Sequence, residues 1–155
     1  IENKGWIDRD LRSQFGNWVY GCDVCQEVCP FQRFSPQTNE RVFYPADADA
    51  VAPHLGTLLS LTDETFAEMY ADSPIKRIKR KRLMRNACIA AGNSGDRQFI
   101  PYLIQLSYDY EPIIRGHTAW ALWQIMRRGA LRQLQDLYDR EDNAEVRAEI
   151  EAIVP

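Results

Sequence analysis

Three cysteines that lie close together are the residues of this chain best suited to chemistry. They are Cys22, Cys25 and Cys29, and Pro30 follows the last of them, so the spacing is C-x2-C-x3-C-P. Deprotonated thiols are soft ligands that bind zinc and iron–sulfur clusters. Either kind of site usually takes four protein ligands, so these three cysteines need partners from elsewhere.

The proline after the third cysteine favours iron–sulfur chemistry. In the bacterial run C-x2-C-x2-C-x3-C-P of two-cluster ferredoxins, the fourth cysteine ligates a different cluster from the other three. When that run is aligned on Cys29-Pro30, its first position falls on Val19, which cannot bind iron. The pattern predicts that Cys22 and Cys25 share one 4Fe–4S cluster and that Cys29 reaches a second. Three thiolates divided in this way complete neither cluster, so we expect these residues alone to hold no full cluster.

Two other uses of the cysteines stay open at this point. A structural zinc site would need more ligands, and the candidates Cys88, His54 and His117 lie in a linker or in predicted helices. A thioredoxin-type redox pair needs a strand before a helix, and the sequence predicts no strand here. We interpret Cys88 as a packing residue and His117 as a helix-surface or packing residue, not as ligands. We expect Trp6, together with Trp18, to cover the metal segment.

A basic stretch is the second candidate site. From Asp72 to Arg97 the chain has eight basic and two acidic residues, which gives this window a charge of +6 in a chain of net charge −3. Such an asymmetry indicates a phosphate-bearing partner, although many charged helix faces are merely solvated. We predict nucleic-acid contacts, made with the phosphate backbone, for Lys76, Arg77, Lys79, Arg80 and Arg82.

The elements that position these residues are predicted to be mostly α-helical. We divide the chain into a partial ferredoxin-type segment at 1–35, a linker with a short helix at 36–60 and a HEAT-like helical domain at 61–155. Helix starts are indicated by Thr62 and by Ser73-Pro74, and a stop by the run 92–96. Further helices are expected at about 98–108, 112–127, 130–139 and 144–153.

The helices repeat along the chain. Residues 87–92 align with residues 118–123 at an offset of 31, and Ile114-Arg115 recurs as Val146-Arg147. Paired helices that recur at this spacing predict a short HEAT-like solenoid, which we expect to fold over residues 73–155 without the first 35. Its predicted core contains Leu83, Ala87, Leu103, Leu106, Ala119, Leu122, Ile125, Leu134 and Leu137.

In combination these motifs resemble the epoxyqueuosine reductase family. The resemblance is carried by the cysteine block, by Ser73-Pro74-Ile75-Lys76-Arg77, by Arg85-Asn86 and by the helical tail. It implies an enzyme that uses cobalamin and two 4Fe–4S clusters to convert epoxyqueuosine to queuosine in tRNA. It also implies that Cys22 and Cys25 bind the cluster nearer the cobalamin, that Cys29 binds the other cluster, and that Cys22 and Asp23 lie beside the cobalamin.

The same resemblance makes this chain a portion of the enzyme that supplies cluster ligands and a tRNA-docking surface and is inactive by itself. The 155 residues start at Ile1 without a Met, which also predicts a portion of a longer protein. The alternative function is a HEAT-type protein-interaction scaffold with a structural metal site. We expect a cytoplasmic monomer without a membrane span; the sequence does not specify the electron donor.

Overall fold

The computed structural model describes residues 3–41, 44–45 and 48–154. Its regular structure within these ranges is helical, without a strand. The α-helices are α1 (Arg9–Arg12), α2 (Val24–Glu27), α3 (Ala48–Val51), α4 (Leu55–Leu59), α5 (Asp63–Met69), α6 (Lys79–Ser94), α7 (Ile100–Leu106), α8 (Pro112–Met126), α9 (Leu131–Arg140) and α10 (Ala144–Ile153). Short 3₁₀ helices lie at Ser13–Phe15, Gln32–Phe34, Pro74–Ile78, Arg97–Phe99 and Arg127–Ala130. The predicted mostly α-helical architecture is confirmed.

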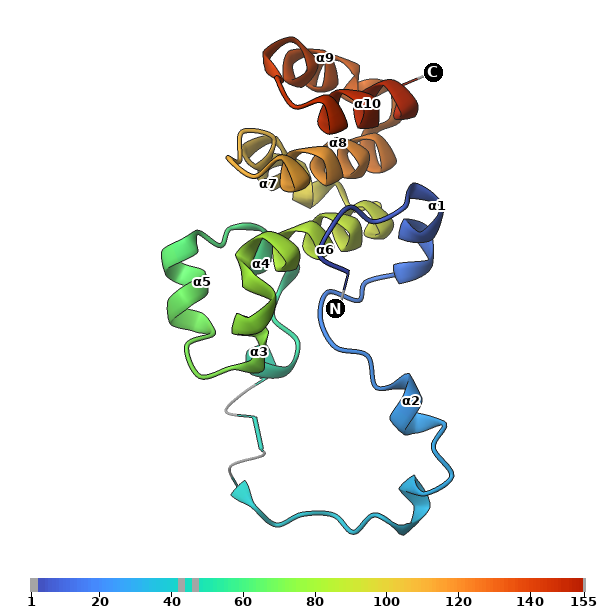
Figure 1. The fold of residues 1–155 in the computed structure, drawn as a ribbon, viewed down its shortest axis with the longest axis vertical. Helices are drawn as coiled ribbons and strands as arrows, with labels where there is room; N and C mark the ends of the chain where they lie inside the picture. The colour runs from blue at the N-terminus through green and yellow to red at the C-terminus, as the bar shows by residue number, and fades with distance from the viewer. Residues whose placement is uncertain (1–2, 42–43, 46–47, 155) are drawn as a thin grey trace.

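Helices α6 to α10 form a layered stack, in which α8 packs against α6 on one side and α10 on the other (Figure 1). The Cys88 thiol on α6 lies 3.4 Å from the Thr118 hydroxyl on α8, 30 residues later. At Gly92 an added Cβ would come within 2.5 Å of the Trp120 ring, so only glycine allows this approach of the two helices. Helices α6 and α8 therefore run parallel, and these contacts join residues 28 and 30 positions apart, close to the repeat offset of 31.

Local signals set the helix ends. The Thr62 side chain accepts a hydrogen bond from the Thr65 N–H, and Thr65 reciprocates, so α5 starts with a capping box. Gly95 ends α6 with a φ of 65°. The helix expected from Ser73-Pro74 onward is broken, because a 3₁₀ helix spans Pro74–Ile78 and Lys79 has a φ of 62° before α6 continues.

The predicted core residues are buried, with Ile125 only partly so. Much of that burial comes from the α6–α8 and α8–α10 interfaces, as expected of stacked repeats. Leu58, Leu59 and Leu61 join the same core from the stretch before α5. The region in front of the predicted solenoid thus contributes apolar side chains to it.

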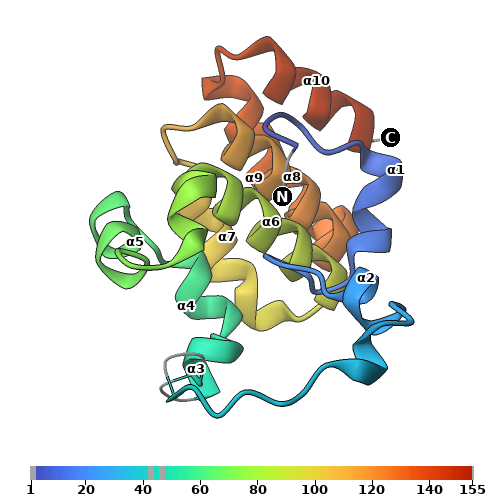
Figure 2. The same cartoon turned by 60° about the horizontal axis from the view of Figure 1, so that its bottom comes forward.

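The N-terminal residues divide into two parts at Gly21. Residues 3–20, here called the strap, run beside α6, α8 and α10, and residues 21–41, here called the cysteine loop, extend away from the stack (Figures 1 and 2). Arg12 is 1% exposed and pairs with Glu149 of α10. Ile7 is 4% exposed and belongs to the main apolar core. The strap therefore shares a core with the solenoid.

Candidate metal segment and nucleic-acid interface

The three cysteines of the loop lie around one short helical turn. Cys25 is part of α2, whose first turn is closed by hydrogen bonds from the Gln26 and Glu27 N–H groups to the Asp23 carbonyl. The Cys29 N–H then donates to the Gln26 carbonyl at 3.1 Å. All three thiols are free, with Cys22 and Cys25 exposed and Cys29 half-buried.

The loop offers the right donor atoms for an iron–sulfur cluster but not a complete set. Across residues 3–41, 44–45 and 48–154, no three His, Cys, Asp or Glu side chains converge on a point that could hold a metal ion. Thiolates are the usual ligands of such clusters, and exposed free thiols can bind a cluster together with cysteines of another segment. The arrangement fits thiols that complete a site together with ligands from outside the described residues.

The five predicted RNA-binding residues differ in how far they are buried. Lys76, Arg77 and Lys79 are exposed around the junction of the 3₁₀ helix and α6. Arg82 is half-buried, and its guanidinium donates to the carbonyls of Ile78 and Arg77 at 2.6 and 2.9 Å. The exposed cations therefore cluster at the start of α6.

Arg80 does not share that exposure. It is 8% exposed, and its guanidinium donates to the Leu61 carbonyl at 2.7 Å and to the Asp109 carboxylate at 2.5 Å. Burial disfavours its charge, but the hydrogen bond and charge of Asp109 outweigh this, so the pKa of Arg80 is raised. The expectation that Arg80 faces outward with its neighbours is corrected: it ties the start of α6 to the loop before α8.

Two titratable residues of the helices are buried: Cys88, as the sequence predicts, and His117, for which the sequence left a surface and a packing position open. Cys88 is fully buried, which raises the pKa of its thiol to about 12. His117 is also fully buried, and burial lowers the pKa of its imidazole to about 3. Its Nε2 lies 3.3 Å from the Ile7 N–H and its Nδ1 lies 2.7 Å from the Ile113 carbonyl, which fits a neutral ring that accepts from the strap.

Trp6 has a different role from the one expected. Its ring stacks on His117 with centroids 5.2 Å apart and lies directly over Gly116, where a Cβ would collide with it. Its indole N–H donates to Glu145 at 2.8 Å. Trp6 therefore fastens the strap to α8 and α10. From the sequence, this side chain was expected to cover the metal segment.

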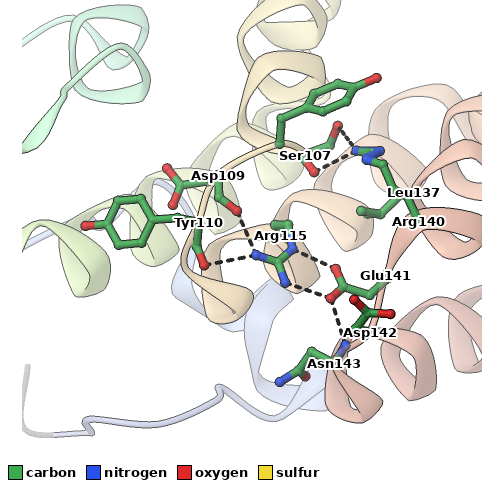
Figure 3. Close-up of a pocket in the computed structure, with 10 residues that line it drawn as sticks. Ser107, Asp109, Tyr110, Arg115, Leu137, Arg140, Glu141, Asp142 and Asn143 are labelled. Atoms are coloured by element: carbon green, nitrogen blue, oxygen red, sulfur yellow. Dashed lines mark hydrogen bonds and ion pairs between the residues drawn. The ribbon is translucent and has the colours of Figure 1, made fainter.

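A pocket of about 560 Å³ lies where the loop before α8 meets the loop before α10. Figure 3 shows Arg115 at its centre, bound to both carboxylate oxygens of Glu141 at 2.6 and 2.7 Å and to the carbonyls of Asp109 and Tyr110. Arg140 likewise donates to Ser107. These arginine donors hold the two loops together, so the pocket is a junction between repeats. This junction was not predicted from the sequence; its signal is the arginine that recurs at the same repeat position, Arg115 on α8 and Arg147 on α10.

Comparison with protein families agrees with this geometry. Residues 76–154, just over half of the chain, match the model of HEAT repeats. The chain belongs to the HEAT-repeat family. Residues 1–32 of this HEAT-repeat chain match a second model, that of a 4Fe-4S double cluster binding domain. The cysteine loop thus carries a recognised iron–sulfur pattern.

Several curated relatives are epoxyqueuosine reductases. Over 131 residues, which are 84% of this chain and 34% of the relative, it is 37% identical to the epoxyqueuosine reductase of Escherichia coli K12. It is 34% identical to that of Bacillus cereus over 94% of this chain and 38% of the relative. A Geobacillus stearothermophilus protein, described as uncharacterised and in the gldA 3′ region, is 34% identical over 96% of this chain and 69% of its own. The predicted resemblance is confirmed, and the chain spans between a third and two fifths of these two reductases.

Solved structures give the same result. A crystal structure of epoxyqueuosine reductase with an epoxyqueuosine-modified tRNA-Tyr stem loop superposes with a TM-score of 0.89 at 30% identity and covers 98% of this chain and 40% of its own. The Bacillus subtilis enzyme gives a TM-score of 0.85 at 29% identity over 98% of this chain and 41% of its own. The arrangement of cysteine loop, strap and solenoid is therefore shared with reductases of known structure.

Proposed function

We propose that this chain is a portion of an epoxyqueuosine reductase, which converts epoxyqueuosine to queuosine in tRNA. The observation that carries the proposal is the match of 98% of the chain to the reductase solved with its modified tRNA stem loop. The free cysteines and the 4Fe-4S double cluster pattern at residues 1–32 support it independently of the solenoid. A HEAT scaffold alone would not need three free cysteines at this spacing.

In this proposal the cysteine loop supplies ligands to two 4Fe–4S clusters. Cys22 and Cys25 bind one cluster and Cys29 binds the other, each with ligands from other parts of the complete protein. Cys22 and Asp23 would contact the cobalamin of the complete protein. When bound, the clusters and the cobalamin supply the electrons and the reactive cobalt, and the protein contributes position and shielding. Within this loop, α2 contains Cys25, and Cys22 and Cys29 lie just before and just after it, so the three thiols are grouped around one short helix.

The complete protein tests the activity. Purified without oxygen and reconstituted with iron, sulfide and cobalamin, it is expected to convert epoxyqueuosine to queuosine in tRNA, as measured by nucleoside analysis. Cys22→Ser and Cys29→Ser should each lower the iron content, and Cys88→Ser should not, because Cys88 is buried against Thr118. The 155 residues alone should be inactive. A reconstituted complete protein that leaves epoxyqueuosine unchanged would refute the proposal.

The start of α6 is proposed to dock the tRNA backbone. Lys76, Arg77 and Lys79 are exposed together, and Arg82 contributes its charge from a half-buried position. Contacts with phosphates position a nucleic acid without selecting its sequence. Arg80 belongs to this site only indirectly, since its hydrogen bonds to Leu61 and Asp109 hold α6 in place.

Salt dependence tests this surface. Replacing Lys76, Arg77 and Lys79 with Ala should weaken tRNA binding and flatten the log–log salt slope by about 0.9 for each phosphate that is no longer neutralised. The matched control replaces the exposed Arg127, Arg128 and Arg132, which removes the same charge near the C-terminal end of α8. Cluster content should not change in either variant. Equal slopes for the two variants would show that the stretch is only solvated and would favour a protein-interaction scaffold.

A further inference from the structure

Helix α6 carries a row of buried and half-buried polar side chains that bind the strap backbone. Arg85 donates to the carbonyls of Asn3 and Gly5 at 3.0 and 2.5 Å. Asn93, two turns further along the helix, donates to the carbonyls of Arg12 and Gly16, both at 2.8 Å. The strap therefore runs along α6 toward its C-terminal end and then turns back.

Asn86 holds the returning part of the strap. Its amide N–H donates to the Val19 carbonyl at 2.8 Å, and its amide oxygen accepts from Arg85 at 3.0 Å. The residue is 7% exposed, so both polar groups are buried and both are satisfied. A buried amide with both of its ends bound has little rotational freedom, and loss of its donor would leave the carbonyl without that partner.

The Val19 carbonyl marks the point from which the cysteine loop departs. Val19 and Tyr20 pack against the core, and Gly21 follows with a φ of 77°, after which Cys22 is exposed. Among the hydrogen bonds between the strap and the solenoid in the described residues, the one from Asn86 to Val19 is the nearest to Cys22 along the chain.

The same helix begins at the basic surface. Asn86 lies seven residues after Lys79, which corresponds to about 10 Å along an α-helix. Arg80 fixes the start of this helix through Leu61 and Asp109. One rigid element thus holds the departure point of the cysteine loop at a set distance from the exposed cations.

We propose that Asn86 is a positioning residue: by holding Val19 it sets where the cysteine loop lies relative to the basic start of α6. The inference rests on the proposed function, because the distance between the cysteine loop and the start of α6 matters only if the loop binds clusters and α6 docks RNA. In the reductase, a displaced loop would move the clusters relative to the bound tRNA. A misplacement of about 1 Å can reduce a rate about 100-fold.

A distance measurement on the 155-residue chain tests the anchor without clusters or RNA. Nitroxide labels are attached at Cys22 and at Lys76→Cys, with Cys25 and Cys29 changed to Ser; Cys88 is fully buried and stays unlabelled. Asn86→Asp keeps the size of the side chain but removes the donor, so the label-to-label distance distribution should broaden and shift. Asn93→Asp is the matched control, because it removes hydrogen bonds only to Arg12 and Gly16 and should leave the distribution unchanged.

A second variant and a second readout separate the possible failures. If Asn86→Asp does not fold by circular dichroism, Asn86→Ser replaces it, since its shorter side chain cannot reach the Val19 carbonyl. In the complete reductase, the Asn86 variant should lower kcat by up to about 100-fold with unchanged tRNA affinity. An unchanged distance distribution in the Asn86 variant overturns the inference. Broadened distances together with a wild-type protein that lacks reductase activity would refute the proposed function and leave the anchor standing.

Discussion

The strap and the cysteine loop are adjacent in sequence, but their side chains have opposite surroundings. In the strap, Ile7 and Arg12 are nearly inaccessible to solvent, and their partners lie in α8 and α10. In the cysteine loop, Val28, Phe31 and Phe34 are 73%, 74% and 68% exposed. The strap is therefore part of the solenoid core, whereas the loop is held by the segments on either side of it and presents its thiols outward.

This difference shows how one N-terminal segment can serve two tasks. Buried polar groups of the solenoid, among them His117, Glu149 and Asn86, find their hydrogen-bond partners in the strap. Without the strap these groups would lose partners that a buried polar atom needs. The cysteine loop differs, because its thiols are free and those of Cys22 and Cys25 are exposed, as the proposed cluster binding requires. The strap thus contributes to the core of the solenoid, whereas the cysteine loop leaves large apolar side chains exposed.

The largest expected effect comes from breaking the strap's buried ion pair. Arg12 donates to Glu149 and twice to the Ile7 carbonyl, and it is 1% exposed. Arg12→Ala should lower the free energy of unfolding by about 3–5 kcal/mol, because it leaves the buried Glu149 carboxylate without its main partner. Urea denaturation of the 155-residue chain measures this.

Arg9 provides the control for that experiment. It lies 3.6 Å from the same Glu149 carboxylate, but its side chain is 43% exposed. Arg9→Ala should therefore cost less than about 1 kcal/mol, as surface ion pairs do. Similar losses for the two variants would mean that the strap is not part of the core.

The sequence carried enough information for the helices but not for the strap. Thr62, Ser73-Pro74 and Gly95 mark helix ends through local chemistry, so those ends were predictable. The repeat offset of 31 likewise predicted that α6 and α8 are equivalent helices of neighbouring repeats. Each of these signals depends on residues close in sequence or on a simple period, so it can be recognised without the tertiary structure.

The errors have a common physical cause. Arg80 stands among exposed cations, and its burial depends on Asp109, which lies 29 residues later. Trp6 lies near the cysteines in sequence, but its partner Glu145 is 139 residues away. A contact between residues so far apart produces no periodic pattern in the sequence. Both residues were therefore given the roles of the residues next to them in the chain.

The next largest effect is expected from pH. Burial lowers the pKa of His117 to about 3 in the folded state, below its ordinary value of 6.5. The unfolded chain therefore takes up this proton first, and the stability that the neutral ring provides above pH 6.5 is lost as the pH falls toward 3. Between about pH 7 and about pH 5 the loss should be about 2 kcal/mol. His117→Gln, which cannot titrate, should show a shallower decline in urea denaturation over the same range; an equally steep decline would assign the pH dependence to other groups.

The smallest effect should come from the cysteine loop. Phe31→Ala and Phe34→Ala should each change the free energy of unfolding by no more than about 0.5 kcal/mol, since exposed side chains leave no cavity when truncated. The matched substitution in the strap is Ile7→Ala, whose side chain lies in the core at 4% exposure, and it should cost about 2–5 kcal/mol. Thermal and urea unfolding of the three variants under one set of conditions give the comparison directly. A loss above about 1 kcal/mol for either phenylalanine would mean that the loop folds back onto the solenoid in solution. Cys22, Cys25 and Cys29 would then be less accessible to ligands from another segment than their exposure in this structure indicates.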